Sequence, residues 1–141
     1  MAGAAGRCAD RAGGRPGDGR RPARRPRPRA GVDVRHGDGA ALPFPDSSFD
    51  AVVCFTMLHH VPSRAEQDRL FAEAARVLRP GGTFAGIDSL LSLRFRLIHV
   101  GDTMTVVDPV GLPPRLVAAG LDAPGTELGG RSFRFRADRP R

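Results

Sequence analysis

The sequence predicts an α/β fold in which parallel strands come first and an antiparallel pair closes the chain. Three stretches support this prediction: an apolar run at 49–55, an amphipathic helical pattern that continues to Leu78, and a second apolar run at 83–88. A strand, a helix and a strand in this order form a right-handed βαβ unit with two adjacent parallel strands. Helices are then expected on the faces of the sheet.

The order of elements from residue 31 is β, β, α, β, α, α, β, β. The first strand, at 32–36, ends in a turn at Gly37 and Asp38, and the run FDAVVCF at 49–55 is typical of a strand covered on both faces. The expected helices lie at 61–82, 90–100 and 113–119, and the hairpin lies at 126–137.

The hairpin has the alternation of a half-buried strand pair. Gly129 and Gly130 form the turn, Phe133 and Phe135 face inward, and the arginines between and after them face outward.

The helix beginning near Ser63 is the clearest local pattern. Ser63 and Glu66 form a capping box, and Leu70, Phe71, Ala74, Val77 and Leu78 share one stripe. On the exposed face Arg69 and Glu73 are spaced to pair one turn apart. Pro80, Gly81 and Gly82 are expected to end the helix.

Charge divides the chain into two parts. Residues 1–30 contain nine Arg and two Asp but no Val, Ile, Leu or Phe, so they cannot bury enough apolar surface to offset the entropy of ordering. We expect a disordered Arg/Gly/Pro-rich tail at 1–30 and one domain at 31–141, where 13 Arg balance 13 acids. The tail has no interleaved aromatic residues, so nucleic-acid binding, which salt would weaken steeply, is only the more distant alternative.

The sequence gives no signal for export, a membrane or a metal. Two cysteines form no disulfide framework, and no apolar run reaches transmembrane length or follows the Arg pairs of the tail as a signal peptide would require. We therefore expect a cytoplasmic protein without a membrane partner. No metal site is expected either, because ligand spacing is missing among His36, Cys54, His59, His60 and His99.

Four short motifs occur in a fixed order with short spacings. They are GDGAALPF at 37–44, FDAV at 49–52, LHHV at 58–61 and RVLRPGG at 76–82. Together they resemble the class I S-adenosylmethionine-dependent methyltransferases, closest to the type 11 branch that methylates small molecules and quinones. The resemblance covers about residues 31–137, and the terminal hairpin agrees with it, since this Rossmann-like fold ends in an antiparallel pair.

The resemblance implies a cofactor site at the carboxyl ends of the strands, where open α/β sheets bind ligands. Asp38 would accept a hydrogen bond from the adenine amino group of S-adenosyl-L-methionine, and the amide of Gly39 would serve a ring nitrogen. Phe55 and Thr56 would contact the cofactor mainly through their backbone. From the residues alone, Asp38 could equally be an aspartate that ends a strand in a turn.

His59 is the candidate catalytic residue. An imidazole titrates near neutral pH and could take a proton from the nucleophile of a small-molecule acceptor. The alternative is that the two histidines at 59 and 60 are structural and cap the next helix. Asp88 ends the strand at 83–88, where it could line the substrate pocket or cap a helix beginning at Ser89.

The family's first two strands and their Gly-rich cofactor loop have no counterpart before residue 31. The resemblance therefore implies an incomplete sheet, truncated at its N-terminus, from the family order 3-2-1-4-5-7-6. The strand at 49–55 would then have an open side, which favours self-association or a non-catalytic interaction module. Losing about three polar contacts of ~1–3 kcal/mol each would weaken cofactor binding by three or more decades. We therefore expect weak or no cofactor binding and doubtful activity from this polypeptide.

Overall fold

The computed structural model describes residues 33, 35–90 and 104–141. The predicted tail at 1–30 and nearly all of the predicted helix at 90–100 lie outside these residues. The elements are β1 (Phe49–Phe55), η1 (Leu58–His60), α1 (Arg64–Val77), β2 (Leu78–Ser89), α3 (Leu112–Ala118), β3 (Asp122–Leu128) and β4 (Ser132–Asp138).

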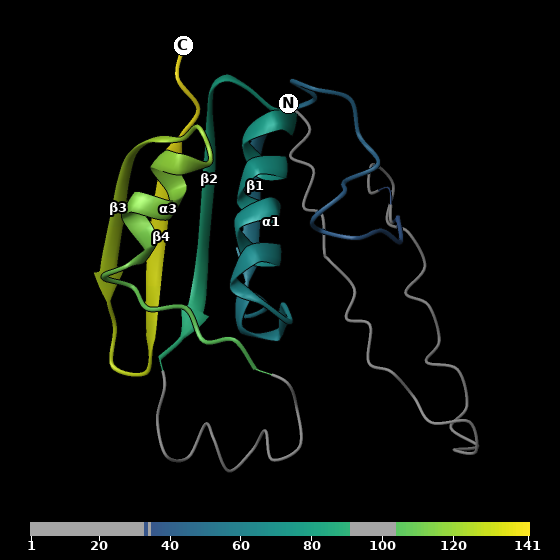
Figure 1. Ribbon diagram of the computed structural model, residues 1–141. Helices are drawn as coiled ribbons and strands as arrows, with labels where there is room; N and C mark the ends of the chain where they lie inside the picture. Colours follow the sequence, from purple (N-terminus) through teal and green to yellow (C-terminus); the bar gives the residue numbers. More distant parts are fainter. Residues whose placement is uncertain (1–32, 34, 91–103) are drawn as a thin grey trace, which may run out of the picture.

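The four strands form one sheet in the order β1-β2-β4-β3 (Figure 1). The β1–β2 pair is parallel, with Phe55 opposite Ile87, and it confirms the predicted βαβ unit. β4 is antiparallel to both β2 and β3, and it confirms the predicted hairpin, in which Phe133 and Phe135 are buried. The sheet therefore has the α/β topology that the sequence predicts, with strands equivalent to 4-5-7-6 of the family order.

The predicted strand at 32–36 is wrong for the residues that can be described. Asp33, Arg35 and His36 have no strand pairing, and the first bridge among the described residues joins Asp38 to Ala41 within a turn. Among the described residues, no strand lies beside β1 on the side away from β2. A strand needs a partner for its backbone groups, and the family order gives this segment a neighbour other than β1.

β1 is also less covered than its apolar sequence suggests. Ala51 is exposed, and the Phe55 side chain is 64% exposed. The expectation of a strand covered on both faces therefore fails at these positions.

Helix α1 begins as predicted but ends earlier. The Ser63 hydroxyl oxygen accepts the backbone N–H of Glu66 at 3.2 Å, which confirms half of the capping box. The helix stops at Val77, and β2 starts at the next residue, so Pro80 to Gly82 lie within the strand instead of ending the helix. The predicted Arg69–Glu73 pair is not the one that forms, because Glu73 binds Arg76.

The core lies between the sheet and the two helices. Phe71 of α1 packs against Phe84 of β2, and Phe84 in turn packs edge-on against Phe135 of β4 at a centroid distance of 5.1 Å. Phe135 lies directly over Gly86, where a Cβ atom would stand 2.5 Å from the ring Cζ. β2 therefore needs glycine at this position.

Arg139 joins the last residues of the chain to the start of β2. Its guanidinium donates to the carbonyl oxygens of Arg76 and Leu78 and to the hydroxyl of Ser47. Its backbone N–H donates to the carbonyl of Gly82 at 2.8 Å. The chain end is thereby fixed to the junction of α1 and β2, beside the loop that precedes β1.

None of the helices among the described residues combines the length and the apolar character that crossing a bilayer requires.

Candidate functional site at the carboxyl ends of β1 and β2

The carboxyl ends of the two parallel strands lie side by side. Phe55 is opposite Ile87, and the backbone N–H of Thr56 donates to the carbonyl oxygen of Ile87 at 2.8 Å. Thr56 has a φ of 48°, the left-handed region that a β-branched residue rarely adopts. Strain of this kind is concentrated at functional sites, where the surrounding structure maintains it. The chain therefore makes a fixed, sharp turn where β1 ends.

This turn brings His59 onto the end of β2. His59 Nδ1 lies 2.5 Å from Asp88 Oδ1, and the backbone N–H of His59 donates to Asp88 Oδ2 at 3.1 Å. Both side chains are buried, with residue exposures of 3% for His59 and 1% for Asp88. The sequence indicates both residues as candidates, but no local pattern predicts their contact, since they are 29 positions apart.

Hydrogen bonds hold the histidine segment from the opposite side. The Gln67 side-chain amide of α1 is fully buried and donates to the carbonyl oxygens of Leu58 and Thr105. The Thr105 backbone N–H donates to the carbonyl oxygen of His59 at 3.0 Å. The η1 turn is thus fixed between α1, β2 and the segment before α3. The cap of α1 is Ser63, so the alternative that the histidines cap the helix is wrong.

Asp38 and Gly39 lie in a separate turn. The Asp38 carboxylate is exposed and accepts the backbone N–H of Ala40 at 2.9 Å, and its carbonyl accepts the N–H of Ala41. The turn that the sequence suggests at this aspartate is present, but the strand that it was expected to end is not. The role of Asp38 toward adenine stays a prediction.

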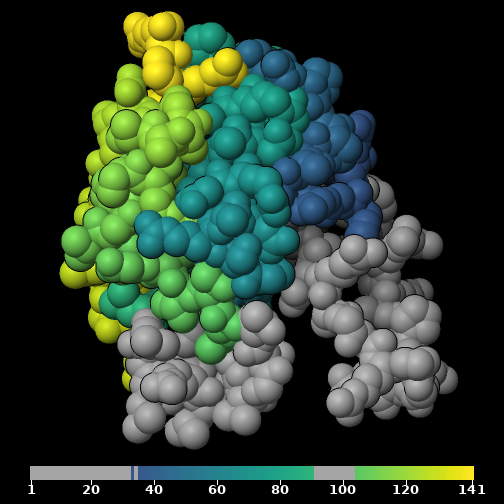
Figure 2. All heavy atoms as spheres, in the orientation of Figure 1, coloured from purple at the N-terminus to yellow at the C-terminus, as the bar shows by residue number. Residues whose placement is uncertain are grey.

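The segment after this turn is fastened to α1. The Leu42 backbone N–H donates to Glu73 at 2.8 Å, and the Arg76 guanidinium donates to the carbonyl oxygens of Leu42 and Phe44 and to Asp46. Figure 2 shows the blue atoms of residues 35–48 against this teal helix. Hydrogen bonding to Arg76 lowers the pKa of Glu73 below its ordinary value of 4.5.

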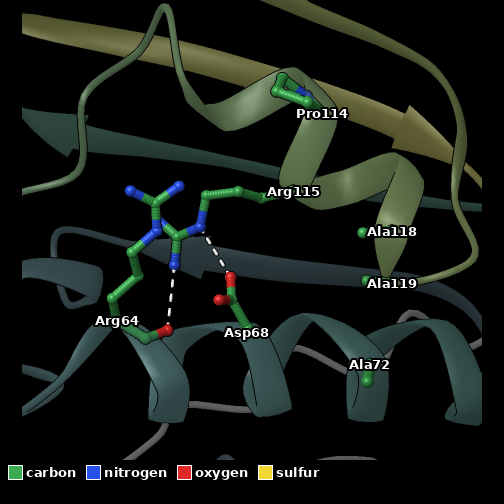
Figure 3. A pocket seen from close by; sticks show the side chains of 7 residues that line it. All are labelled: Arg64, Asp68, Ala72, Pro114, Arg115, Ala118 and Ala119. Carbon is green, nitrogen blue, oxygen red and sulfur yellow. Dashed lines mark hydrogen bonds and ion pairs between the residues drawn. The ribbon is translucent and has the colours of Figure 1, made fainter.

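A shallow hollow of about 320 Å³ lies between α1 and α3, as Figure 3 shows. At its polar end, hydrogen bonds from Arg115 connect α3 to α1. Arg115 donates to Asp68 at 2.6 Å, to the carbonyl oxygen of Arg64 and to Gln67, and it stacks over Phe71. Small residues line the rest: Ala72, Pro114, Ala118 and Ala119. The guanidinium is engaged in helix packing, so the strand ends are the stronger candidate site.

The described part of the chain has no group of three His, Cys, Asp or Glu side chains that could hold a metal ion.

Comparison with known proteins defines the class. Residues 18–86 match the family described as a methyltransferase domain. The chain is 49% identical over 53 residues to a probable S-adenosylmethionine-dependent methyltransferase of Mycolicibacterium smegmatis, covering 38% of this chain and 20% of the relative. It is 40% identical over 88 residues to 27-O-demethylrifamycin SV methyltransferase of Amycolatopsis mediterranei, covering 60% of this chain and 26% of the relative.

Solved structures share the fold. A putative methyltransferase in complex with the Trm112 methyltransferase activator, from Haloferax volcanii, matches with a TM-score of 0.67 at 17% identity, over 81% of this chain and 64% of that one. Human N-acetylserotonin methyltransferase, solved in complex with SAM, matches with a TM-score of 0.63 at 20% identity, over 79% of this chain and 34% of that one.

The sequence matches, together with the shared fold, support a class I S-adenosylmethionine-dependent methyltransferase, and S-adenosyl-L-methionine is the cofactor of this class. The matches of this chain span a fifth to about a quarter of the length of the two curated relatives named above.

The described residues fit one part of this cofactor. The exposed Asp38 carboxylate and the Gly39 amide can face an adenine edge, and Phe55 presents an exposed ring at the end of β1. A carboxylate and a backbone amide are the complementary acceptor and donor for that edge. The described residues contain no Gly-rich turn between a strand and a helix, which the ribose and amino-acid groups would require.

Proposed function

We propose that this chain carries the adenine-binding and proton-transfer portion of a methyltransferase that acts on a small-molecule acceptor. S-adenosylmethionine, when bound, supplies an electrophilic methyl group. Asp38 and Gly39 would hold the adenine, Phe55 and Thr56 would line the cofactor's path at the end of β1, and His59 would accept the proton of the acceptor's nucleophile. The paired, buried His59 and Asp88 beside the strand ends carry this proposal.

Methyl transfer has two requirements that these residues would meet. The acceptor must be held in line with the methyl group, and its nucleophile must lose a proton when it is a hydroxyl or an ammonium. His59 supplies a nitrogen base on a turn that is hydrogen-bonded to α1, to β2 and to Thr105. A base held this rigidly keeps its orientation when the acceptor binds.

Cofactor binding by this 141-residue polypeptide is proposed to be weak, in the millimolar range or above. An NMR titration of the ¹⁵N-labelled chain with S-adenosylhomocysteine tests this. We expect the ligand to change the chemical shifts of the backbone amides of Gly39, Ala40 and Thr56. These changes should be absent in the D38A variant. The D122N variant, which alters an exposed aspartate at the start of β3, should bind as the wild type does.

Low-micromolar binding would show that a full cofactor cradle exists and would refute the proposed weakness. Shifts that persist in D38A, or that lie away from residues 38–40, would refute the adenine site.

A second function is favoured by the edge of β1, which in the described residues has a sheet neighbour on one side only. Two copies could pair their β1 edges in an isologous, antiparallel dimer. Light scattering against concentration would then show a rising mass. The A51K variant, which places a charge on this exposed edge, should have a lower apparent mass at the same concentration. A wild-type mass that does not change with concentration would exclude the dimer.

A further inference from the structure

The segment that precedes β1 is bound to α1 by side chains rather than by strand pairing. Pro43 and Pro45 have no backbone N–H, so this segment cannot form a regular strand ladder. The Leu42 N–H instead donates to Glu73 Oε2 at 2.8 Å, and the Leu42 carbonyl oxygen accepts from Arg76 Nη2 at 3.1 Å. Both backbone groups of Leu42 therefore depend on two side chains of one helix.

The shape of Arg76 suits this contact, because its guanidinium presents several N–H donors in one plane. Nε and Nη2 bind the two carboxylate oxygens of Glu73, at 2.7 and 2.8 Å. Nη1 donates to the carbonyl oxygen of Phe44 at 2.9 Å and to Asp46 at 2.6 Å. The Glu73 side chain is 19% exposed and that of Arg76 is 31% exposed, so both are largely shielded from water. One planar group thus joins the segment to the helix at several acceptors.

The turn at 38–41 is attached directly to this anchored residue. It is closed by its own hydrogen bonds, in which backbone N–H groups donate to the side chain and the carbonyl oxygen of Asp38. The chain leaves the turn at Leu42. On the other side of the turn, Gly37 lies against Pro43, where a Cβ atom on the glycine would stand 3.2 Å from the ring Cδ. The orientation of the turn therefore depends on where α1 holds Leu42.

We propose that Glu73 and Arg76 are positioning residues for the cofactor site, and that they act by holding Leu42 on α1. The position of Leu42 in turn places the Asp38 carboxylate and the Gly39 amide toward adenine. This rests on the proposed function, in which those two groups bind the adenine.

Ser48 offers an internal comparison within the same segment. Its backbone N–H donates to the backbone carbonyl oxygen of Val77 at 2.8 Å. This bond uses no side chain of α1. Substitution of Glu73 or Arg76 should therefore release the segment at Leu42 and leave it attached at Ser48.

The first test needs no cofactor, because it follows amide hydrogen exchange of the intact ¹⁵N-labelled chain by NMR. E73A removes a charged acceptor and should speed exchange at Leu42 by about tenfold or more, while exchange at Ser48 stays within about twofold of the wild type. E73Q keeps a carbonyl oxygen for the Leu42 N–H and should restore part of the protection. R69A removes an exposed arginine of the same helix, so both amides should exchange as in the wild type.

The second test asks whether this attachment matters for cofactor binding. In a titration with S-adenosylhomocysteine, the initial slope of the shift changes at Gly39 and Ala40 is inversely proportional to Kd when binding is weak. R76A should lower this slope about fivefold or more per folded molecule, whereas R69A should leave it unchanged. A role in overall stability alone would not change the slope per folded molecule. E73A gives the same comparison if R76A does not fold.

A Leu42 amide that is unprotected in the wild type, or equally protected in E73A, would overturn the proposal. Equal losses at Leu42 and Ser48 would overturn it as well, since they would show general loosening of the domain. An unchanged slope in folded R76A or E73A would show that the attachment does not position the turn. If the wild type shows no shift changes at Gly39 and Ala40 although E73A alters exchange at Leu42 as expected, the proposed adenine site fails and the attachment to α1 stands.

Discussion

Replacing Gly86 with alanine would test the packing of the sheet at its centre. The added Cβ atom would stand 2.5 Å from Phe135 Cζ and closer still to the carbonyl oxygen of Cys54. Ordinary contacts begin near 3.4 Å, so the overlap with the ring is about 0.9 Å. Overpacking of a core costs ~1–3 kcal/mol. We expect the upper value for G86A, because one obstacle is backbone of the paired strand and cannot rotate away.

Thermal and urea unfolding would measure this cost. A loss of ~3 kcal/mol should lower the melting temperature by roughly 12–24 °C for a domain of this size. G130A is the matched control, because nothing lies within 4 Å of its new Cβ, and its free energy of unfolding should stay within ~0.5 kcal/mol of the wild type.

The source of the cost can be separated with a second substitution. F135L removes the ring, so G86A should cost about 1 kcal/mol less in that background than in the wild type. The Cys54 carbonyl remains, so rescue should be partial. If G86A unfolds as G130A does, β2 and β4 do not pack as described and the reasoning fails.

Two further predictions concern α1. S63A should lower the free energy of unfolding by ~1 kcal/mol in denaturant titrations, since it removes the acceptor for the Glu66 N–H; an unchanged midpoint would contradict the cap. Because the pKa of Glu73 is lowered, its stabilisation is complete above about pH 4.5 and is lost as the pH falls further. The free-energy difference between wild type and E73Q should therefore shrink below pH 4.5, whereas E127Q, an exposed control, should show no such trend.

Short sequence patterns predicted most of the helices and strands. The contacts between residues far apart in the sequence could not be predicted from such patterns. The Ser63 cap, the apolar run of β1 and the Gly129-Gly130 turn each depend on neighbours within a few residues. The segment at 32–36 has a strand's sequence, but a strand also needs a partner, which no local pattern reveals.

The candidate site shows the same division. Arg69 and Arg76 were both within reach of Glu73, and Arg76 is the one that binds, because it also reaches the carbonyl oxygens of Leu42 and Phe44. Likewise, the sequence indicated His59 and Asp88 as separate candidates. Their contact depends on the parallel pairing of β1 with β2, which only the three-dimensional arrangement displays.

The strand order has a consequence for biosynthesis. Of the four described strands β4 is made after the other three, yet it lies between β2 and β3 rather than at an edge. While the polypeptide is still emerging from the ribosome, β3 has no sheet neighbour among these strands, and one side of β2 remains uncovered. The nascent chain must therefore wait for β4 before these four strands can form one sheet, and contacts of such long sequence separation form slowly. During that interval the exposed strand edges would be natural targets for chaperones.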